Sequence, residues 1–295
     1  MTLRHGERAR GLARAAHQTF EPLHLLAYFG PHVDATRESL GIGWLGSYVG
    51  MRAAPLGPVP GPVVAATFYG FHPAAVAKAW GLALHDHSPA DLDDLRTACV
   101  DAGLRATLGD LVGSPELARQ AARMREVISR ADLGGRALAA AYAALPWPDE
   151  PHLALWHAAT VWREWRGDGH NAVLVAHGLA PLDALVLYDA WLTPEQAAAG
   201  RGRGFLQPTR KWDDDQWESA TAALLEQGLV SRDSGSVRAT EQGRVLRDEI
   251  EDATDDASAS VWVGVDGADD LVASFRPFSK AVIVAGVLPG TQRPS

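Results

Sequence analysis

The chain has 295 residues, of which 47% are hydrophobic and 21% charged, a balance typical of a globular protein with a sizeable core. Its single cysteine, Cys99, excludes an intramolecular disulfide and a cysteine-based zinc cluster. The formal net charge is −9, and residues 211–256 hold five Lys or Arg against thirteen Asp or Glu, a net of −8 in that segment alone. Nearly all of the excess negative charge therefore lies in one part of the chain.

No stretch of the sequence predicts export or membrane insertion. The first residues, MTLRHGERARGLARAAH, are basic but contain no apolar core followed by a small-residue cleavage site. The longest apolar runs, such as AVIVAGVLPG, are far shorter than the ~20 residues that span a bilayer. With a single cysteine as well, we expect a cytoplasmic protein that does not enter a membrane.

Helical periodicity dominates the first two-thirds of the sequence. Residues 7–29 have leucines and aromatics at spacings of three and four, which predicts an amphipathic helix with Pro22 at a helix start or a break. Residues 52–64 are rich in proline and glycine and predict an extended connector. Two Ser-Pro pairs, at 88–89 and 114–115, are each soon followed by an acid and predict the capped starts of amphipathic helices.

The segment LPWPDEP precedes the next helical pattern. We expect one helix to begin near His152 and to stop at Gly167, and a second to run from about His170 to Gly178. Asp168 would then be the N-cap of the second helix, with the glycines on either side supplying the turn.

The acidic segment follows the order helix, glycine turn, hairpin, helix. WDDDQWESATAALLEQGLV predicts a helix that stops at Gly228, SRDSGSVRAT a hairpin, and TEQGRVLRDEIEDATDD a closing helix capped by Thr240. This order resembles the winged helix of MarR-type regulators, with LDALVLYDAWLTPEQAAAG as its earlier helices. We therefore predict a mainly α fold: a pocket-forming helical domain over 1–178, a winged-helix (MarR-like) domain with a small β-hairpin over 179–260, and a C-terminal segment, 261–295, that packs back on the helical domain.

A winged helix binds DNA by placing its second helix in the major groove and its hairpin on phosphates. Here that helix opens with Asp213, Asp214 and Asp215, which would repel phosphates, and Arg232 and Arg238 on the hairpin are too few to compensate. We interpret the unit as a structural or dimerisation module that has lost DNA binding. It is compatible with a homodimer, and nucleic acid is not an expected partner.

Two segments are candidates for a small-molecule site. TFYGFHP places His72 beside Tyr69 and Phe71 and before a helix-starting proline. His72 is either a boundary residue bonded to backbone or a base or ligand in an aromatic pocket. The helix expected from residue 152 has an unusually polar and aromatic pair of faces, formed by His152, Trp156, His157 and Arg163.

REWRGDGH, residues 163–170, concentrates charge next to those faces. A helix N-terminus beside Arg163, Arg166 and His170 is suited to bind an anion or to transfer a proton, although such a cluster can also be a structural ion network. We predict that the two arginines anchor an anion. His170, oriented by Asp168, would carry the proton in any reaction, with His72 as a second base.

Three stretches resemble a family of actinobacterial proteins described as helix-turn-helix-like or MarR-like: TFYGFHPAAV, LPWPDEPHLALWHAATVWREWRGDGHNAVLVAHGL and SFRPFSKAVIVAG. The resemblance covers nearly the whole chain. The family name implies a regulator. The shared motif implies a common pocket centred on His72, His152, His157, Arg163, Arg166, Asp168 and His170.

These observations predict a small-molecule-binding protein, and we hypothesise a biosynthetic or detoxifying enzyme. The alternatives are a MarR-like transcriptional regulator that binds DNA and a non-catalytic protein that sequesters a ligand. A haem or metal bound by one histidine is compatible with the sequence, but no motif requires it. The identity of the ligand and of any cofactor stays open.

Overall fold

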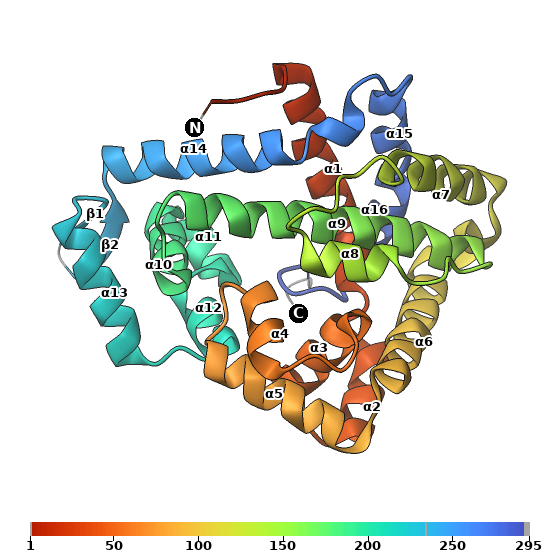
Figure 1. Ribbon diagram of the computed structural model, residues 1–295, viewed down its shortest axis with the longest axis horizontal. Helices are drawn as coiled ribbons and strands as arrows, with labels where there is room; N and C mark the ends of the chain where they lie inside the picture. The colour runs from red at the N-terminus through yellow and green to blue at the C-terminus, as the bar shows by residue number, and fades with distance from the viewer. Residues whose placement is uncertain (1, 234, 292–295) are drawn as a thin grey trace.

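A computed structural model describes residues 2–233 and 235–291, and helices dominate it (Figure 1). The first elements are α1 (Glu7–Leu25), α2 (Pro31–Leu40), α3 (Gly43–Ala53), η1 (Ala54–Leu56), α4 (Gly61–Thr67), α5 (Pro73–Asp86), α6 (Pro89–Leu108), η2 (Gly109–Gly113), α7 (Pro115–Ile128) and α8 (Ala137–Ala143). They are followed by α9 (Pro151–Ala176), α10 (Pro181–Trp191), α11 (Pro194–Gln196), η3 (Ala197–Arg201), α12 (Arg203–Arg210), α13 (Asp214–Glu226), β1 (Val230–Asp233), β2 (Ser236–Ala239), α14 (Glu241–Ala257), η4 (Ser260–Trp262), α15 (Ala268–Ser274) and α16 (Arg276–Val284).

The largest hydrophobic core surrounds α9. This helix packs against α1, α7 and α8, and α16 closes the same core by packing on α1 and α6. A second apolar cluster, built around Phe68 and Trp80, joins α3, α4 and α5. Burial of apolar surface, at roughly 25 cal/mol per Å², is the main term that holds these helices together. The main core thus unites both ends of the chain, while the predicted division into domains stays a prediction.

The elements from α10 to α14 follow the order predicted for a winged helix. β1 and β2 pair antiparallel, with Val230 opposite Ala239, and Trp217, Leu224 and Ile250 lie in a separate core of this unit. The prediction of a mainly α fold with one small hairpin is therefore confirmed. α14 runs from the hairpin alongside α9 and also contacts α1 (Figure 1), so it joins the winged unit to the main core.

The predicted break at REWRGDGH is wrong, because α9 is one continuous helix of 26 residues. Each glycine inside a helix costs about 1 kcal/mol relative to alanine, but most of α9 is buried and this packing outweighs the penalty. Gly169 serves a close approach: a Cβ there would lie 2.4 Å from Nη1 of Arg136. The Arg136 guanidinium donates to the carbonyls of Trp165 and Ala257. Gly169 therefore makes room for Arg136 beside the helix, and neither glycine of this segment forms a turn.

Exchanging the two glycines of α9 for alanine should give opposite results. Gly167→Ala should raise the free energy of unfolding by about 0.5–1 kcal/mol, because the new Cβ meets only Nη1 of Arg163 at 3.5 Å and Oε2 of Glu164 at 3.7 Å. Gly169→Ala should lower it by about 1–3 kcal/mol, because the Arg136 guanidinium must move and lose its hydrogen bonds. Urea unfolding of the matched pair tests this, and equal effects would contradict it.

The structure corrects the expectations for Pro22 and for residues 52–64 and confirms the two predicted serine caps. Pro22 lies inside α1, but only in its last turn, so the helix ends three residues later at Leu25. Residues 52–64 are not an extended connector, because they contain the end of α3, the turn η1 and the start of α4. The serines at 88 and 114 cap α6 and α7 as predicted, each accepting a backbone N–H at 3.2 Å.

Candidate functional site

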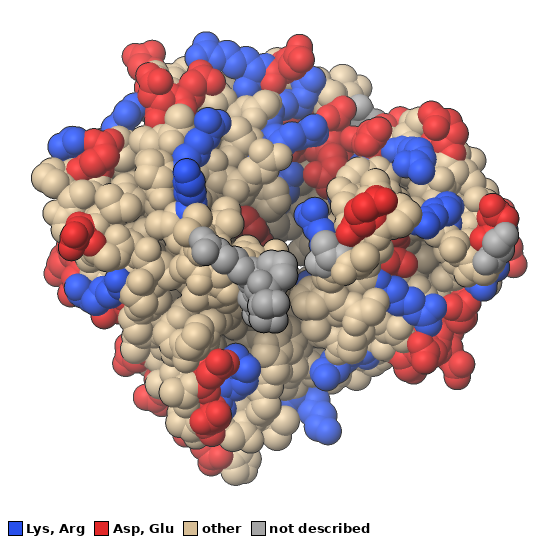
Figure 2. All heavy atoms as spheres, turned by 180° about the vertical axis from the view of Figure 1, so that it is seen from behind, with Lys and Arg blue, Asp and Glu red and all other residues tan. Residues whose placement is uncertain are grey.

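A cavity of about 350 Å³ lies where α9 faces residues 67–71 and the helices α10 and α12. The structure places five of the predicted site residues on its wall: Tyr69, Phe71, Arg163, Asp168 and His170. A more polar hollow of about 820 Å³ adjoins it and shares Arg163, Gly167 and His170. Seen from behind, the molecular surface is hollowed near its centre, with basic and acidic side chains around the rim (Figure 2).

Residues 67–71 form a fixed wall of the cavity. The Tyr69 hydroxyl donates to the carbonyl of Leu179 at 2.5 Å, which ties the segment to the turn after α9. The Trp212 indole donates to the carbonyl of Gly70 at 3.0 Å, and the His72 N–H donates to the carbonyl of Arg210 at 2.8 Å. These bonds join α4 and α5 to the turn between α12 and α13, so the winged unit and the helical core share one wall.

Arg210, at the end of α12, points a cation at this cavity. Its guanidinium carbon lies 4.5 Å from the centre of the Phe71 ring, a cation–π contact, and its Nη1 donates to Thr209 Oγ1 at 3.0 Å. Within residues 2–233 and 235–291, no carboxylate forms an ion pair with it. Burial, together with nearby Arg52 and Arg163, lowers the pKa of Arg210.

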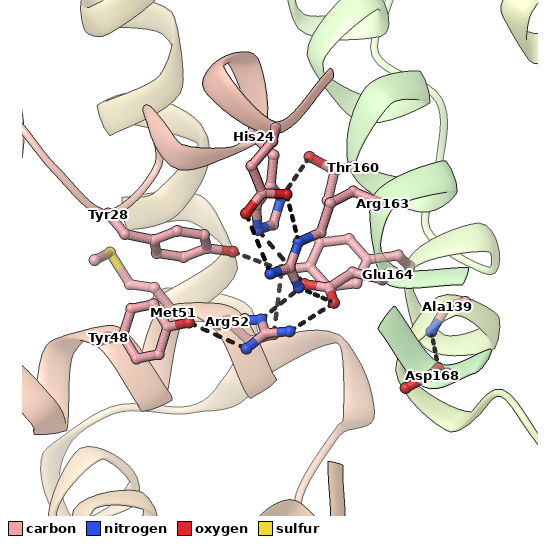
Figure 3. Close-up of polar contacts among 12 residues, drawn as sticks. His24, Tyr28, Tyr48, Met51, Arg52, Ala139, Thr160, Arg163, Glu164 and Asp168 are labelled. Atoms are coloured by element: carbon pink, nitrogen blue, oxygen red, sulfur yellow. Dashed lines mark hydrogen bonds and ion pairs between the residues drawn. The ribbon is translucent and has the colours of Figure 1, made fainter. Parts of the chain in front are cut away.

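Behind the cavity lies a buried network centred on Glu164 (Figure 3). Its carboxylate accepts two bonds from Arg52, each 2.7 Å long, and one from Arg163 at 2.9 Å. Arg163 also donates to Glu21 at 3.0 Å, and the His24 ring lies 3.7 Å from Glu164. Two arginines thus face two glutamates, and the network is neutral when His24 is uncharged.

The protonation of this network follows from burial and ion pairing. Burial lowers the pKa of His24 to about 3, and Arg163 adds to that effect, so the imidazole is neutral near pH 7. Burial alone would raise the pKa of Glu21, but the Arg163 charge outweighs it and holds the pKa at about 2. The pKa of Glu164 is also lowered, because Arg52 and Arg163 overcome its burial. Arg163 therefore already pairs with two carboxylates, and its predicted role as an anion anchor stays a prediction.

Asp168 caps a helix, but a different one from that predicted. Its Oδ2 accepts the backbone N–H of Ala139 (Figure 3) and that of Leu138, both at 3.0 Å, at the start of α8. A carboxylate at a helix N-terminus is stabilised by these donors and by the helix dipole. Burial nevertheless raises the pKa of Asp168. Its role as the N-cap of a helix starting at His170 is wrong, because it sits in the middle of α9.

His170 faces both hollows, but Thr254 on α14 holds its ring. Its Nδ1 shares a hydrogen bond of 2.9 Å with Thr254 Oγ1, so the prediction that Asp168 orients it is wrong. Burial lowers the pKa of His170 to about 4, although Glu251 opposes the shift. Arg166 lines the larger hollow and pairs with Asp255 at 2.9 Å.

The remaining predicted residues do not line the cavity. His72 caps the start of α5 and shares a 3.2 Å hydrogen bond with Gln216. His152 lies 2.6 Å from Asp101, and Trp156 donates to the carbonyl of His24. His157 packs edge-on against Trp147, and burial lowers its pKa to about 4. The functional roles proposed for these residues stay predictions.

Sequence reasoning missed several residues that shape the site: Glu21, His24, Arg52, Arg210 and Arg247. A signal existed for Arg52, since it is the only charged residue in the segment GWLGSYVGMRA that forms α3. A lone charge in an apolar helix needs a buried partner. Arg210 has no such signal, because it lies in a polar segment that gives no hint of its position at a cavity.

The described part of the chain contains no group of three or more His, Cys, Asp or Glu side chains arranged to hold a metal ion. No helix in that part is by itself long and apolar enough to cross a membrane. Only α9 and α10 taken together meet the requirement of length and composition, with a bend of 98° between them, and most of α9 is buried within the protein.

Comparison with known proteins gives one match. A family model described as a helix-turn-helix family matches residues 13–289. No curated protein and no solved structure matches the chain. Because the family match covers both the helical core and the winged unit, the chain belongs to this helix-turn-helix family.

Proposed function

We propose that the protein binds a small organic anion with an aromatic or otherwise apolar body in the cavity between α9 and residues 67–71. The observation that carries the proposal is Arg210, a cation on the cavity wall without a carboxylate partner in the described chain. A partly buried charge without an ion-pair partner costs free energy that a counter-charge would offset. An anionic ligand would supply it.

Among the arginines on the cavity wall, Arg210 alone has no ion pair within the described chain, although the Asp168 carboxylate lies on the same wall. Arg52 and Arg163 are matched by the two glutamates of the buried network, and Arg247 pairs with Glu251. The rest of the wall suits an aromatic or apolar body, because it includes the rings of Tyr48, Phe68, Tyr69, Phe71 and Tyr188. Such pockets combine an apolar lining with a few polar groups that fix orientation.

Isothermal titration with benzoate and its neutral analogue benzamide tests the proposal. Benzoate should bind the wild type more tightly than benzamide, and Arg210→Gln should weaken benzoate roughly 10–100-fold while leaving benzamide unchanged. Arg244→Gln removes the same charge from an exposed position on α14 that lines none of the hollows described here, and it should change neither affinity. Equal benzoate affinities for Arg210→Gln and wild type would overturn the proposal.

We also propose that the winged unit does not bind DNA. Helix α13 exposes Asp214, Asp215 and Glu218 and contains no lysine or arginine. Its acids already pair with two arginines: Asp214 with Arg203, and Glu218 with both Arg203 and Arg232. Gel shifts with mixed-sequence duplexes at 20 mM salt should show no complex, since low salt maximises phosphate contacts. A complex that weakens steeply with added salt would support the regulator hypothesis instead.

The arrangement favours binding over acid–base catalysis. A general base works best with a pKa near the operating pH, and His170 has a pKa of about 4. The His170 ring is hydrogen-bonded to Thr254 and not to Asp168, so the acid–histidine pair expected for proton transfer is not formed. A ligand-sequestering protein therefore fits these residues better than the enzyme that we hypothesised from the sequence.

A further inference from the structure

An apolar groove of about 970 Å³ adjoins the cavity along α9. It is bordered by α4, α5 and the C-terminal half of α9. Six residues line both spaces: Thr67, Tyr69, Phe71, Asp168, Asn171 and Pro181. Because the two spaces share these residues, they adjoin along the wall that these residues form.

The groove differs from the cavity in its chemistry. Apart from the shared residues, its wall consists of alanine, valine, proline and glycine. The Asp168 carboxylate at its edge is the exception, and its Oδ2 accepts two backbone N–H groups. Val63 on α4 and Val175 on α9 leave 45% and 62% of their surfaces in water. Covering these valines with an apolar chain would remove that surface from water.

Resting on the proposed function, we infer that the ligand is an amphiphilic carboxylic acid. Its carboxylate contacts Arg210 in the cavity, and its apolar chain passes residues 67–71 and lies in the groove between α4 and α9. The two spaces match the two parts of such a molecule. The cavity offers its carboxylate a cation that has no carboxylate partner in the described chain, and the groove offers its alkyl chain an apolar wall. A short aromatic acid would fill only the first.

A chain-length series tests the inference. Titration of the wild type with butanoate, hexanoate and octanoate should show an affinity that rises about two- to fourfold per methylene, because each added methylene enters the groove. Val175→Asp should reduce the affinity for octanoate to about that for butanoate and leave butanoate unchanged. Val175 is largely exposed, so this variant keeps the fold. Val245→Asp, at an exposed valine of α14 that lines none of the hollows described here, should behave as wild type.

The possible results separate this inference from the function on which it rests. Octanoate binding no tighter than butanoate, with both weakened by Arg210→Gln, would overturn the amphiphile and leave the anion site standing. A chain-length effect that survives in Val175→Asp would place the alkyl chain of the ligand outside the groove, and it would also overturn the inference. A chain-length effect that disappears in Val175→Asp, with octanoate affinity unchanged in Arg210→Gln, would support the groove as the site of the alkyl chain. It would reject Arg210 as the anchor of the carboxylate. Absence of binding by benzoate and by all three alkanoates would reject both proposals.

Discussion

Replacing Glu164 by glutamine should lower the free energy of unfolding by about 3–5 kcal/mol, the loss found when one partner of a buried ion pair is removed. The carboxylate is 1% exposed and accepts bonds from both Arg52 and Arg163. In the variant, two buried guanidinium groups would face each other with only Glu21 to balance them. Equilibrium unfolding in urea at pH 7 measures the loss, and a change below 1 kcal/mol would contradict the central role of Glu164.

The double variant Arg52→Met with Glu164→Leu is the control. It removes both charges of the pair and leaves Arg163 paired with Glu21, so it should recover much of the lost free energy of unfolding.

The loss of stability in Glu164→Gln should also depend on pH. The folded-state pKa of Glu164 is lowered, so its stabilisation is complete above the unfolded value of about 4.5 and fades as the pH falls toward the folded value. The gap between wild type and Glu164→Gln should therefore narrow below pH 4.

Replacing Gly243 by alanine should lower the free energy of unfolding by about 3 kcal/mol. A Cβ at this position of α14 would lie 2.0 Å from the carbonyl oxygen of Leu229. That oxygen already accepts the N–H of Thr240 at 3.0 Å, so the hairpin cannot shift without losing a backbone bond. Thermal and urea unfolding should both report the loss.

Gly11→Ala is the matched control for Gly243→Ala. Gly11 is also inside a helix, but no heavy atom lies within 4 Å of its added Cβ. This variant should gain about 0.5–1 kcal/mol from helix propensity alone. A loss at Gly11 similar to that at Gly243 would show that close approach to the hairpin is not the cause.

Local chemistry made much of the fold predictable. The serines at 88 and 114, and Thr240, cap their helices as expected, because a cap depends on residues within one turn of it. The winged unit was likewise recognisable, since its helices, glycine turn and hairpin are consecutive in sequence. Where local structure depends on residues close in sequence, the sequence predicts it.

REWRGDGH shows where such reasoning fails. Two glycines around an aspartate are typical of a helix junction, yet here the helix is unbroken, and Gly169 allows Arg136, about thirty residues earlier, to pass beside it. Asp168 serves α8, which is equally distant in sequence. The role of each of these residues depends on a partner that only tertiary packing brings close, so no local sequence pattern predicts it.

The candidate site was partly predictable for the same reason. Tyr69, Phe71, Arg163, Asp168 and His170 stood out by their chemistry, and they do line one cavity. The sequence could not show that Arg163 would be neutralised by Glu21, 142 positions away. Nor could it distinguish Arg210, whose place at the cavity depends on the packing of α12 against residues 67–71.

The long helix α14 has a mechanical consequence. It is part of the winged unit at Ile250, and one turn later Asp255 binds both Arg14 of α1 and Arg166 of α9. The unit therefore has no free hinge about which to swing, unlike modules tethered by a linker. We expect any ligand of the cavity to enter and leave by rotation of side chains at its mouth while the backbone stays closed, so amide hydrogens in α14 and α9 should already be strongly protected from exchange in the ligand-free protein.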